Sequence, residues 1–187
     1  MRGAMVRTVF LAAAAIMSAC GESSARTSRD KADSVASSVP STARIEVGRP
    51  LLQYSAKTLS GEQVEVGGHG GPLTLVNVWA TWCRSCREEM RDLAAIHRDY
   101  GSRGLRVVAV SVDAGSERLV RRVVERDSLT FQVVHDQAGI IQTRYRVVGV
   151  PTSYLIGRDG LLLWQQVGGI HGNLPKVRVE VERALGQ

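Results

Sequence analysis

The most informative segment of this chain is Val76-Asn77-Val78-Trp79-Ala80-Thr81-Trp82-Cys83-Arg84-Ser85-Cys86-Arg87-Glu88-Glu89-Met90. It begins inside a near-continuous apolar run, residues 73–80, of the kind that forms a buried central strand. Two closely spaced cysteines follow, and apolar residues then recur at helical spacing to about Tyr100. The segment therefore predicts a buried strand that turns at Cys83 into an amphipathic helix.

The cysteines set the chemistry that this turn can carry. The chain has three, and two of them, Cys83 and Cys86, are separated by only two residues. A disulfide that closes so short a loop adds little stability, so this pair indicates redox chemistry. The N-terminus of a helix stabilises a thiolate through its free amides and its dipole. We expect Cys83 to attack a partner disulfide and Cys86 to resolve the mixed disulfide.

The N-terminus has the pattern of a targeting segment. Two arginines precede a short apolar run, residues 9–17, which is too short to span a bilayer comfortably. Met17-Ser18-Ala19-Cys20 resembles the lipobox of bacterial lipoproteins, which implies that Cys20 is lipidated and anchors the protein to a membrane. We therefore expect a signal peptide over residues 1–20 and an extracytoplasmic location, on the periplasmic face or the cell surface. An ordinary cleaved signal peptide with an incidental cysteine is the alternative.

Composition limits the rest of the chain. Its 187 residues suffice for one domain, and residues 21–43, rich in Ser, Ala and Arg, predict a flexible linker before a folded domain at 44–187. Without Arg2 and Arg7, 22 of the 24 basic residues face 18 acids, a net charge of +4. Acids and bases are interspersed, which argues against nucleic-acid binding. No nucleotide or phosphate motif appears, and no histidine has a second ligand at metal-like spacing, so we expect no cofactor and no metal.

The remaining patterns predict alternating strands and helices. Strands are expected at 51–58, 63–66, 105–112, 131–134, 153–156 and 161–167, and helices at 116–126, 139–144 and 174–185. In the helix 116–126 the side chains expected to point inward are Leu119, Val120, Val123 and Val124. The predicted fold class is α/β, a mixed central sheet flanked by helices on both faces.

The segment 76–90 and the later Gly149-Val150-Pro151-Thr152 together resemble thioredoxin-fold proteins, most closely the membrane-anchored branch typified by TlpA and ResA. The resemblance covers residues 44–187 and implies a thioredoxin-like fold with an extra N-terminal β-hairpin. It implies that Pro151 is a cis-proline facing the disulfide, and that the Val150 backbone pairs with an extended substrate segment. An ordinary trans turn at Pro151 is the alternative.

The resemblance also singles out Glu89, three residues after Cys86, as a carboxylate that exchanges a proton with Cys86 or tunes the pair. A solvated acid beside Glu88 is the alternative. Asn77 stands where cytoplasmic thioredoxins typically place a buried aspartate, so an acid–base role falls to Glu89. Trp82 either covers the site and contacts substrate or is an aromatic at the edge of the core.

The resemblance implies the function of a thiol–disulfide oxidoreductase, foremost a reductase of protein disulfides. A membrane or periplasmic electron donor would supply its electrons. Cytochrome c maturation is the best-known use of such proteins. An oxidase or isomerase is the first alternative, because Arg84 beside the thiolate favours the reduced form. A peroxidase is disfavoured by Ala80, where peroxiredoxins carry threonine. A copper carrier using Cys83 and Cys86, with or without His171, is the alternative outside enzymes.

Overall fold

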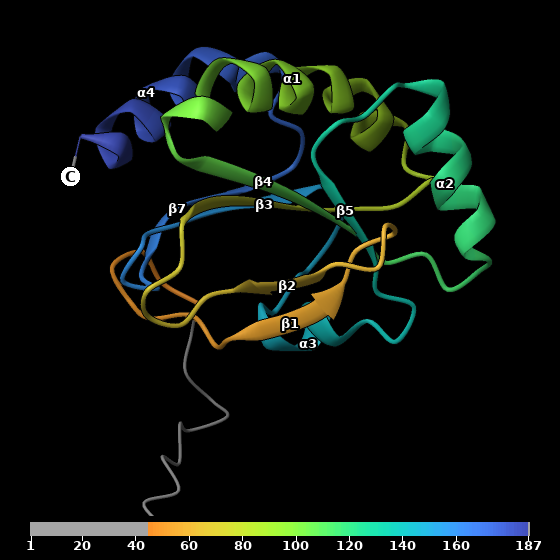
Figure 1. The fold of residues 1–187 in the computed structure, drawn as a ribbon, viewed down its shortest axis with the longest axis horizontal. Coiled ribbons are helices and arrows are strands. Elements are labelled where there is room, and N and C mark those ends of the chain that lie inside the picture. The colour runs from red at the N-terminus through yellow and green to blue at the C-terminus, as the bar shows by residue number, and fades with distance from the viewer. Residues whose placement is uncertain (1–44, 187) are drawn as a thin grey trace, which may run out of the picture. The chain divides into compact units, whose positions relative to one another are not determined.

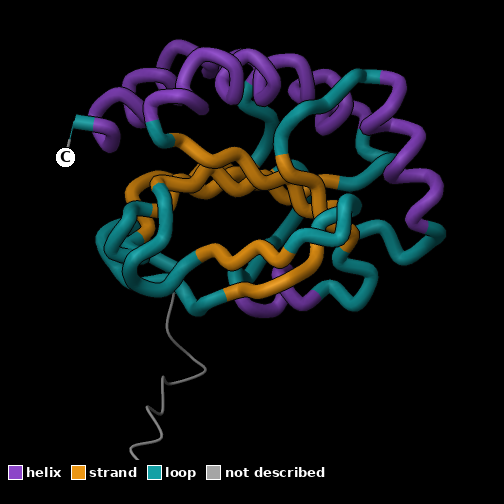
Figure 2. Tube along the Cα trace, in the orientation of Figure 1, coloured by secondary structure: helices purple, strands orange, loops and turns teal. Residues whose placement is uncertain are grey.

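A five-stranded sheet with the strand order β5-β4-β3-β6-β7 separates two layers of the domain (Figures 1 and 2). The structure, a computed structural model, describes residues 45–186, which all belong to one unit. The central strand, β3 (Leu73–Trp79), is buried along its whole length, as its apolar run predicted. The proposed signal peptide, Cys20 and the linker lie outside the described residues.

The sheet is mixed, as predicted. Strands β4 (Leu105–Ser111) and β5 (Gln132–His135) continue it in parallel from β3. On the other side β6 (Thr152–Ile156) pairs antiparallel with β3, and β7 (Leu162–Val167) pairs antiparallel with β6. Alternate residues of β3 enter two different hydrophobic clusters, one on each face of the sheet. That double burial is why the strand shows no alternation of polar and apolar residues.

Three helices cover the first face of the sheet: α1 (Arg84–Tyr100), α2 (Glu117–Arg126) and α4 (Leu174–Leu185) (Figure 1). After α1 a short 3₁₀ turn, Gly101–Arg103, ends at Gly104, whose φ of 102° favours glycine. The buried side chains of these helices include Met90, Leu93, Ile96, Val120, Val123, Val177 and Val181. Helix α1 thus carries the cysteine pair along one side of the core.

The second face is covered by the hairpin of β1 (Tyr54–Lys57) and β2 (Gln63–Val66) together with the short helix α3 (Ile140–Arg144). The predicted extra hairpin and the predicted helices on both faces are therefore confirmed. Strand β1 begins three residues later than predicted, because the preceding segment pairs elsewhere. The Leu51 amide donates to the carbonyl of Gly160 at 3.1 Å, in the turn between β6 and β7.

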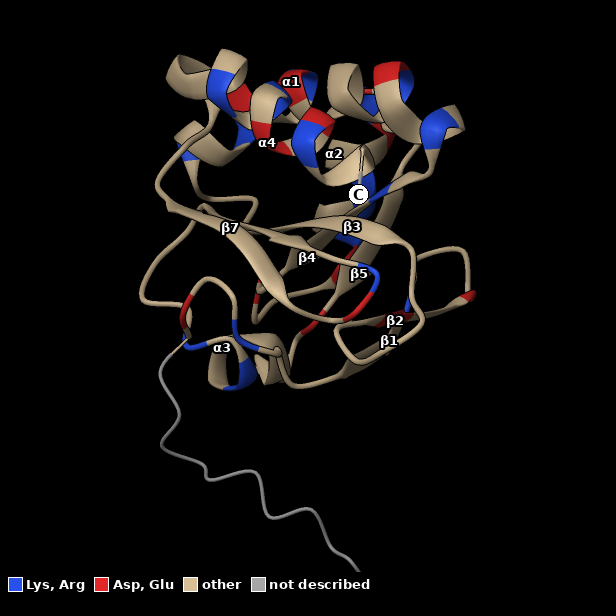
Figure 3. Ribbon diagram, turned by 90° about the vertical axis from the view of Figure 1, so that its left-hand side faces the viewer, with Lys and Arg blue, Asp and Glu red and all other residues tan. Residues whose placement is uncertain are grey.

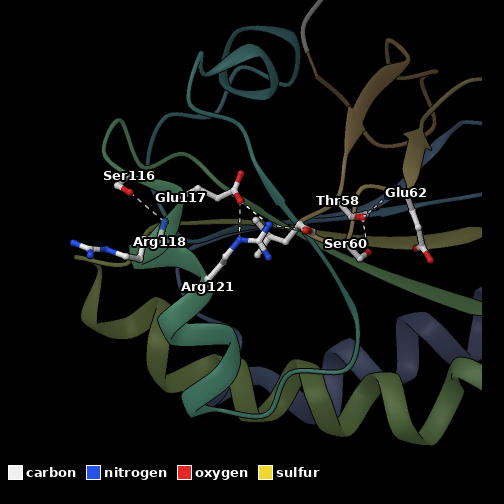
Figure 4. A network of polar contacts seen from close by, with 8 residues as sticks. Thr58, Ser60, Glu62, Ser116, Glu117, Arg118 and Arg121 are labelled. Atoms are coloured by element: carbon white, nitrogen blue, oxygen red, sulfur yellow. Dashed lines mark hydrogen bonds and ion pairs between the residues drawn. The ribbon is translucent and has the colours of Figure 1, made fainter.

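Strand β5 is an edge strand of the sheet, and the segment that follows β1 covers it. The Leu59 amide donates to the carbonyl of Val133 at 2.8 Å, and Thr58 forms a bridge with Val134. Arg121 of α2 holds this segment: its Nη2 donates to the Leu59 carbonyl at 2.7 Å, and its guanidinium pairs with Glu117 (Figure 4). Covering an edge strand in this way removes a template for unwanted strand pairing.

One predicted inward residue is wrong. Leu119 is 43% exposed, whereas Val120 and Val123 of the same helix are buried. Successive residues of a helix are rotated by about 100°, which puts Leu119 at the margin of the apolar stripe centred near Val120. Within residues 45–186 no helix is both long enough and apolar enough to cross a membrane.

Candidate active site

Cys83 occupies the N-cap position of α1. Its backbone is extended (φ −82°, ψ 112°), and its Sγ accepts a hydrogen bond from the Cys86 amide at 3.2 Å. The two cysteines form a disulfide, in which Cys83 is 7% exposed and Cys86 is completely buried. The same amide and the helix dipole stabilise negative charge on the Cys83 sulfur once the disulfide is reduced. Of the pair, Cys83 is the cysteine reachable from solvent.

The loop that leads into Cys83 is held by Asp113, at the end of the neighbouring strand β4. The Asp113 carboxylate accepts hydrogen bonds from the Thr81 amide at 2.9 Å, the Thr81 hydroxyl at 2.6 Å and the Ser111 hydroxyl at 2.7 Å. No sequence motif singled out Asp113 as a site residue. The adjacency of the carboxyl ends of two parallel strands was the signal that could have found it.

The turn that contains Val150 and Pro151 lies beside the disulfide. The carbonyl oxygen of Val150 lies 3.8 Å from the Cys83 Sγ, and the Val150–Pro151 peptide bond is cis, as the resemblance implied. The Thr152 hydroxyl donates to the Gly149 carbonyl at 2.6 Å and closes this turn. The two motifs that sequence analysis linked are therefore neighbours in space, although Cys83 and Val150 are 67 residues apart.

Glu89 is completely buried, one helical turn beyond Cys86 on the same side of α1. Its Oε1 accepts from the Asn77 side-chain amide at 2.7 Å, and its Oε2 accepts from the Ile170 amide at 2.8 Å. Burial raises the pKa of Glu89 to about 7, although these two hydrogen bonds favour the charged form. The alternative of a solvated acid describes only the adjacent Glu88, which is exposed.

Asn77 connects Glu89 to the sheet. Its Nδ2 donates both to Glu89 and to the Ser153 hydroxyl, the latter at 3.0 Å, and all three side chains are completely buried. The Asn77 Oδ1 is buried and has no hydrogen-bond partner among the described residues. A buried acceptor without a partner is unusual, and redox or catalytic sites are among the places where one occurs. Neither Ser153 nor Ile170 was expected at this site from the sequence.

The two residues that flank Cys83 in the chain are both exposed. Trp82 is 71% exposed, so it is not an aromatic at the edge of the core. Arg84 points its guanidinium at Glu88, with Nε and Oε1 2.9 Å apart. The positive charge of Arg84 is therefore paired with a carboxylate at the helix surface.

His171, in the 3₁₀ turn His171–Asn173 before α4, pairs with Asp92 at 2.7 Å. Among the described residues, no three His, Cys, Asp or Glu side chains gather closely enough to hold a metal ion. The three-residue set Cys83, Cys86 and His171 is therefore not assembled in the described residues.

A redox-active cysteine pair at the start of a helix, opposite a cis-proline and on a mixed sheet, defines a thioredoxin-fold thiol–disulfide oxidoreductase. The chain belongs to the AhpC/TSA family, whose model matches residues 47–165. It is 36% identical over 126 residues to the thioredoxin-like protein YneN of Bacillus subtilis, covering 66% of this chain and 73% of YneN. It is 29% identical over 126 residues to the thiol-disulfide oxidoreductase ResA of Bacillus cereus, covering 67% and 72%.

Solved structures show the same fold. StoA of Bacillus subtilis superimposes with a TM-score of 0.61 at 22% identity, covering 70% of this chain and 96% of StoA. A thiol:disulfide interchange protein of the thioredoxin family from Chlorobium tepidum superimposes with a TM-score of 0.63 at 23% identity, covering 76% and 99%. The predicted thioredoxin-like fold and thiol–disulfide oxidoreductase class are therefore confirmed.

Proposed function

We propose that this protein is an extracytoplasmic reductase of protein disulfides. The observation that carries the proposal is the difference between the two cysteines: Cys83 is reachable at the helix N-terminus, and Cys86 is buried one helical turn from the buried carboxyl group of Glu89. Such an arrangement separates an attacking thiol from a resolving thiol that has its own proton acceptor.

The reaction proceeds in two exchanges. The Cys83 thiolate attacks one sulfur of the partner disulfide, whose S–S bond breaks as a mixed disulfide with Cys83 forms. Cys86 then loses its proton to Glu89 and attacks the Cys83 sulfur, which restores the Cys83–Cys86 disulfide and releases the partner as a dithiol. Two electrons pass to the partner, and a pKa near 7 suits Glu89 to accept and return the proton at neutral pH.

Substrate enters between Trp82 and the turn at Val150 and Pro151 in this proposal. The Val150 carbonyl already lies against the Cys83 sulfur, so an extended segment beside it would bring its own sulfur into line with Cys83. Trp82 offers an exposed apolar face on the other side of Cys83.

The surroundings of Arg84 support electron flow from this protein to its partner, which is the direction of a reductase. A cation beside the thiolate would stabilise the reduced form and make the pair oxidising. Arg84 is at the surface and pairs with Glu88, so much of its field at Cys83 is cancelled or screened. The neighbouring carboxyl group of Glu89, when charged, acts in the opposite sense.

We further propose that residues 1–20 are a signal peptide, that lipidated Cys20 anchors the chain to the membrane, and that 21–43 tether the domain 44–187. An electron donor in the membrane or periplasm would return the Cys83–Cys86 disulfide to the dithiol. The haem-attachment cysteines of cytochrome c are the substrate class that the resemblance suggests. Incorporation of labelled fatty acid into the wild type but not into Cys20→Ser tests the anchor.

The redox equilibrium of the Cys83–Cys86 pair against glutathione tests the reductase. We expect a reduction potential well below the value of about −120 mV that is typical of a strong oxidant. A value near that figure would contradict the proposal in favour of an oxidase.

Mixed-disulfide trapping tests the roles of the two cysteines. In Cys86→Ser, Cys83 still attacks but no thiol resolves, so partner proteins accumulate covalently on the chain. The matched control Cys83→Ser should trap none. Adducts found only with Cys83→Ser would reverse the assignment.

A further inference from the structure

A groove runs along α1 from Arg84, the residue after Cys83, and reaches the C-terminal end of α2. Its volume is about 570 Å³, and charged side chains form its walls: Arg84, Arg87, Glu88, Arg91, Asp92, Arg126, Asp127 and His171. We call it the arginine groove. Figure 3 shows basic and acidic positions interspersed along the helices of this layer.

All three acids of the arginine groove already have basic partners within it. Glu88 pairs with Arg84 at 2.9 Å and Asp92 with His171 at 2.7 Å. Asp127 pairs with Arg126 at 2.6 Å. Each wall carboxylate therefore forms its ion pair with a residue other than Arg87 or Arg91.

Two arginines of the groove have no such partner in the part of the chain that the structure describes. Arg87 and Arg91, one turn apart on α1, are exposed and make no ion pair or side-chain hydrogen bond with any described residue. Both line the groove. The hydrogen bond from Arg126 lowers the pKa of Asp127, and the charges of Arg91 and Arg87 add to this effect across the groove. Two neighbouring guanidinium forks thus face a concave surface with their donors unused.

One end of the groove lies close to Cys83 in the chain. Arg84 lines it and is the first residue of α1, directly after Cys83. Exposed apolar side chains flank the site in the chain: Trp82, directly before Cys83, is 71% exposed, and Val148, two residues before Val150, is 84% exposed. A partner that brings a disulfide to Cys83 would meet apolar surface around the sulfur and positive charge along α1.

We propose that the arginine groove is the docking site for an acidic segment of the protein whose disulfide Cys83 attacks. This inference rests on the proposed reductase and specifies its substrate class: disulfide-bearing proteins with Asp or Glu close to the reactive cysteine. Guanidinium forks at α1 match single carboxylates. The three wall carboxylates, spaced between the arginines, leave room for separate acidic side chains but repel the continuous anionic surface of a membrane.

Matched peptide disulfides test the groove. Each peptide carries one cysteine joined to the same coloured thiol and differs only in three flanking residues, which are all Glu, all Gln or all Lys. The rate constant for attack by the reduced full chain is measured by release of the coloured thiol at low and at physiological ionic strength. We expect the Glu peptide to react about tenfold faster than the Lys peptide at low salt, with a smaller ratio at higher salt.

The decisive variant is the double charge reversal Arg87→Glu, Arg91→Glu. It should remove or invert the Glu-to-Lys ratio, and using a ratio cancels any change in the reactivity of Cys83 itself. Lys57→Glu on β1, on the opposite layer of the domain, changes the net charge by reversing one exposed cation away from the groove and should keep the wild-type ratio.

Four results would overturn the inference. Equal rates for the three peptides while the Gln peptide is reduced would refute the groove and leave the reductase intact. An unchanged ratio in the double variant would assign the preference to other charges. Binding of the wild type, but not the double variant, to phosphatidylglycerol vesicles, together with equal peptide rates, would make the groove a membrane contact. Failure to reduce any peptide would refute the reductase and the groove together.

Discussion

Glu89→Gln is the substitution that isolates the buried carboxyl group. The two side chains have nearly the same shape, but glutamine does not ionise. In the wild type Glu89 is completely buried and has a pKa of about 7, against an ordinary value of 4.5. The difference between the two values corresponds to about 3 kcal/mol at 1.36 kcal/mol per pH unit.

The sign follows from proton binding. Because the pKa of Glu89 is higher in the folded protein, the folded state binds more protons than the unfolded chain between pH 4.5 and about 7. The wild type should therefore lose up to about 3 kcal/mol of unfolding free energy as the pH rises through this window. Glu89→Gln lacks that loss, so its stability relative to the wild type should rise by the same amount.

The side-chain amide of Asn77 can adapt to a glutamine at position 89. The side-chain oxygen of the introduced glutamine would keep the hydrogen bond from the Ile170 amide, and its Nε2 would face Asn77. If the Asn77 side chain turns over, its Oδ1, which has no partner among the described residues of the wild type, accepts from that Nε2 and from the Ser153 hydroxyl. The variant should therefore fold.

Urea denaturation of the oxidised protein at intervals from pH 4.5 to 8.5 measures the effect, with the disulfide intact so that neither cysteine titrates. Glu88→Gln, which removes an exposed acid at the preceding position, is the matched control and should follow the wild-type curve. Parallel curves for Glu89→Gln and the wild type over this range would refute the burial argument. In steady-state reduction of a neutral disulfide, Glu89→Gln should also lose an inflection near pH 7.

Other substitutions test the fold around the site. Asp113→Ala removes the acceptor of the Thr81 amide, so it should lower the unfolding free energy by about 2–3 kcal/mol and speed hydrogen exchange at Thr81; unchanged exchange would exclude the loop anchor. Leu93→Ala should cost about 2–5 kcal/mol in urea denaturation because it opens a cavity under α1. Leu119→Ala, the same change at an exposed site, should stay within about 0.5 kcal/mol, and equal losses would contradict the packing described.

Local patterns were sufficient to predict the frame of the site. The apolar run before Cys83 and the helical spacing after it predicted β3 and α1, and α1 begins at Arg84 with Cys83 as its cap. Strand burial and helix periodicity are properties of neighbouring residues, so a single sequence displays them. The cis bond before Pro151 came from the resemblance alone, since cis bonds are a small minority even before proline.

Leu119 shows where such patterns fail. Helical spacing placed it with Val120, Val123 and Val124, but a short helix buries only the part of its apolar stripe that meets a neighbour. The start of β1 failed for a similar reason: Leu51 has the residue type of a strand, but its amide pairs with Gly160 in a distant turn. Which neighbour a segment meets depends on the packed chain.

Local sequence patterns were enough to predict that Cys83 and Cys86 form a redox pair at the start of a helix, because the strand, the spacing and the helix are all local. The surroundings of that pair depend on how distant segments pack. Glu89 receives its hydrogen bonds from Asn77, 12 residues away, and Ile170, 81 residues away, and its burial separates it from the otherwise similar Glu88. Desolvation and partner geometry set the pKa of a carboxyl group, and both exist only once distant segments have packed together.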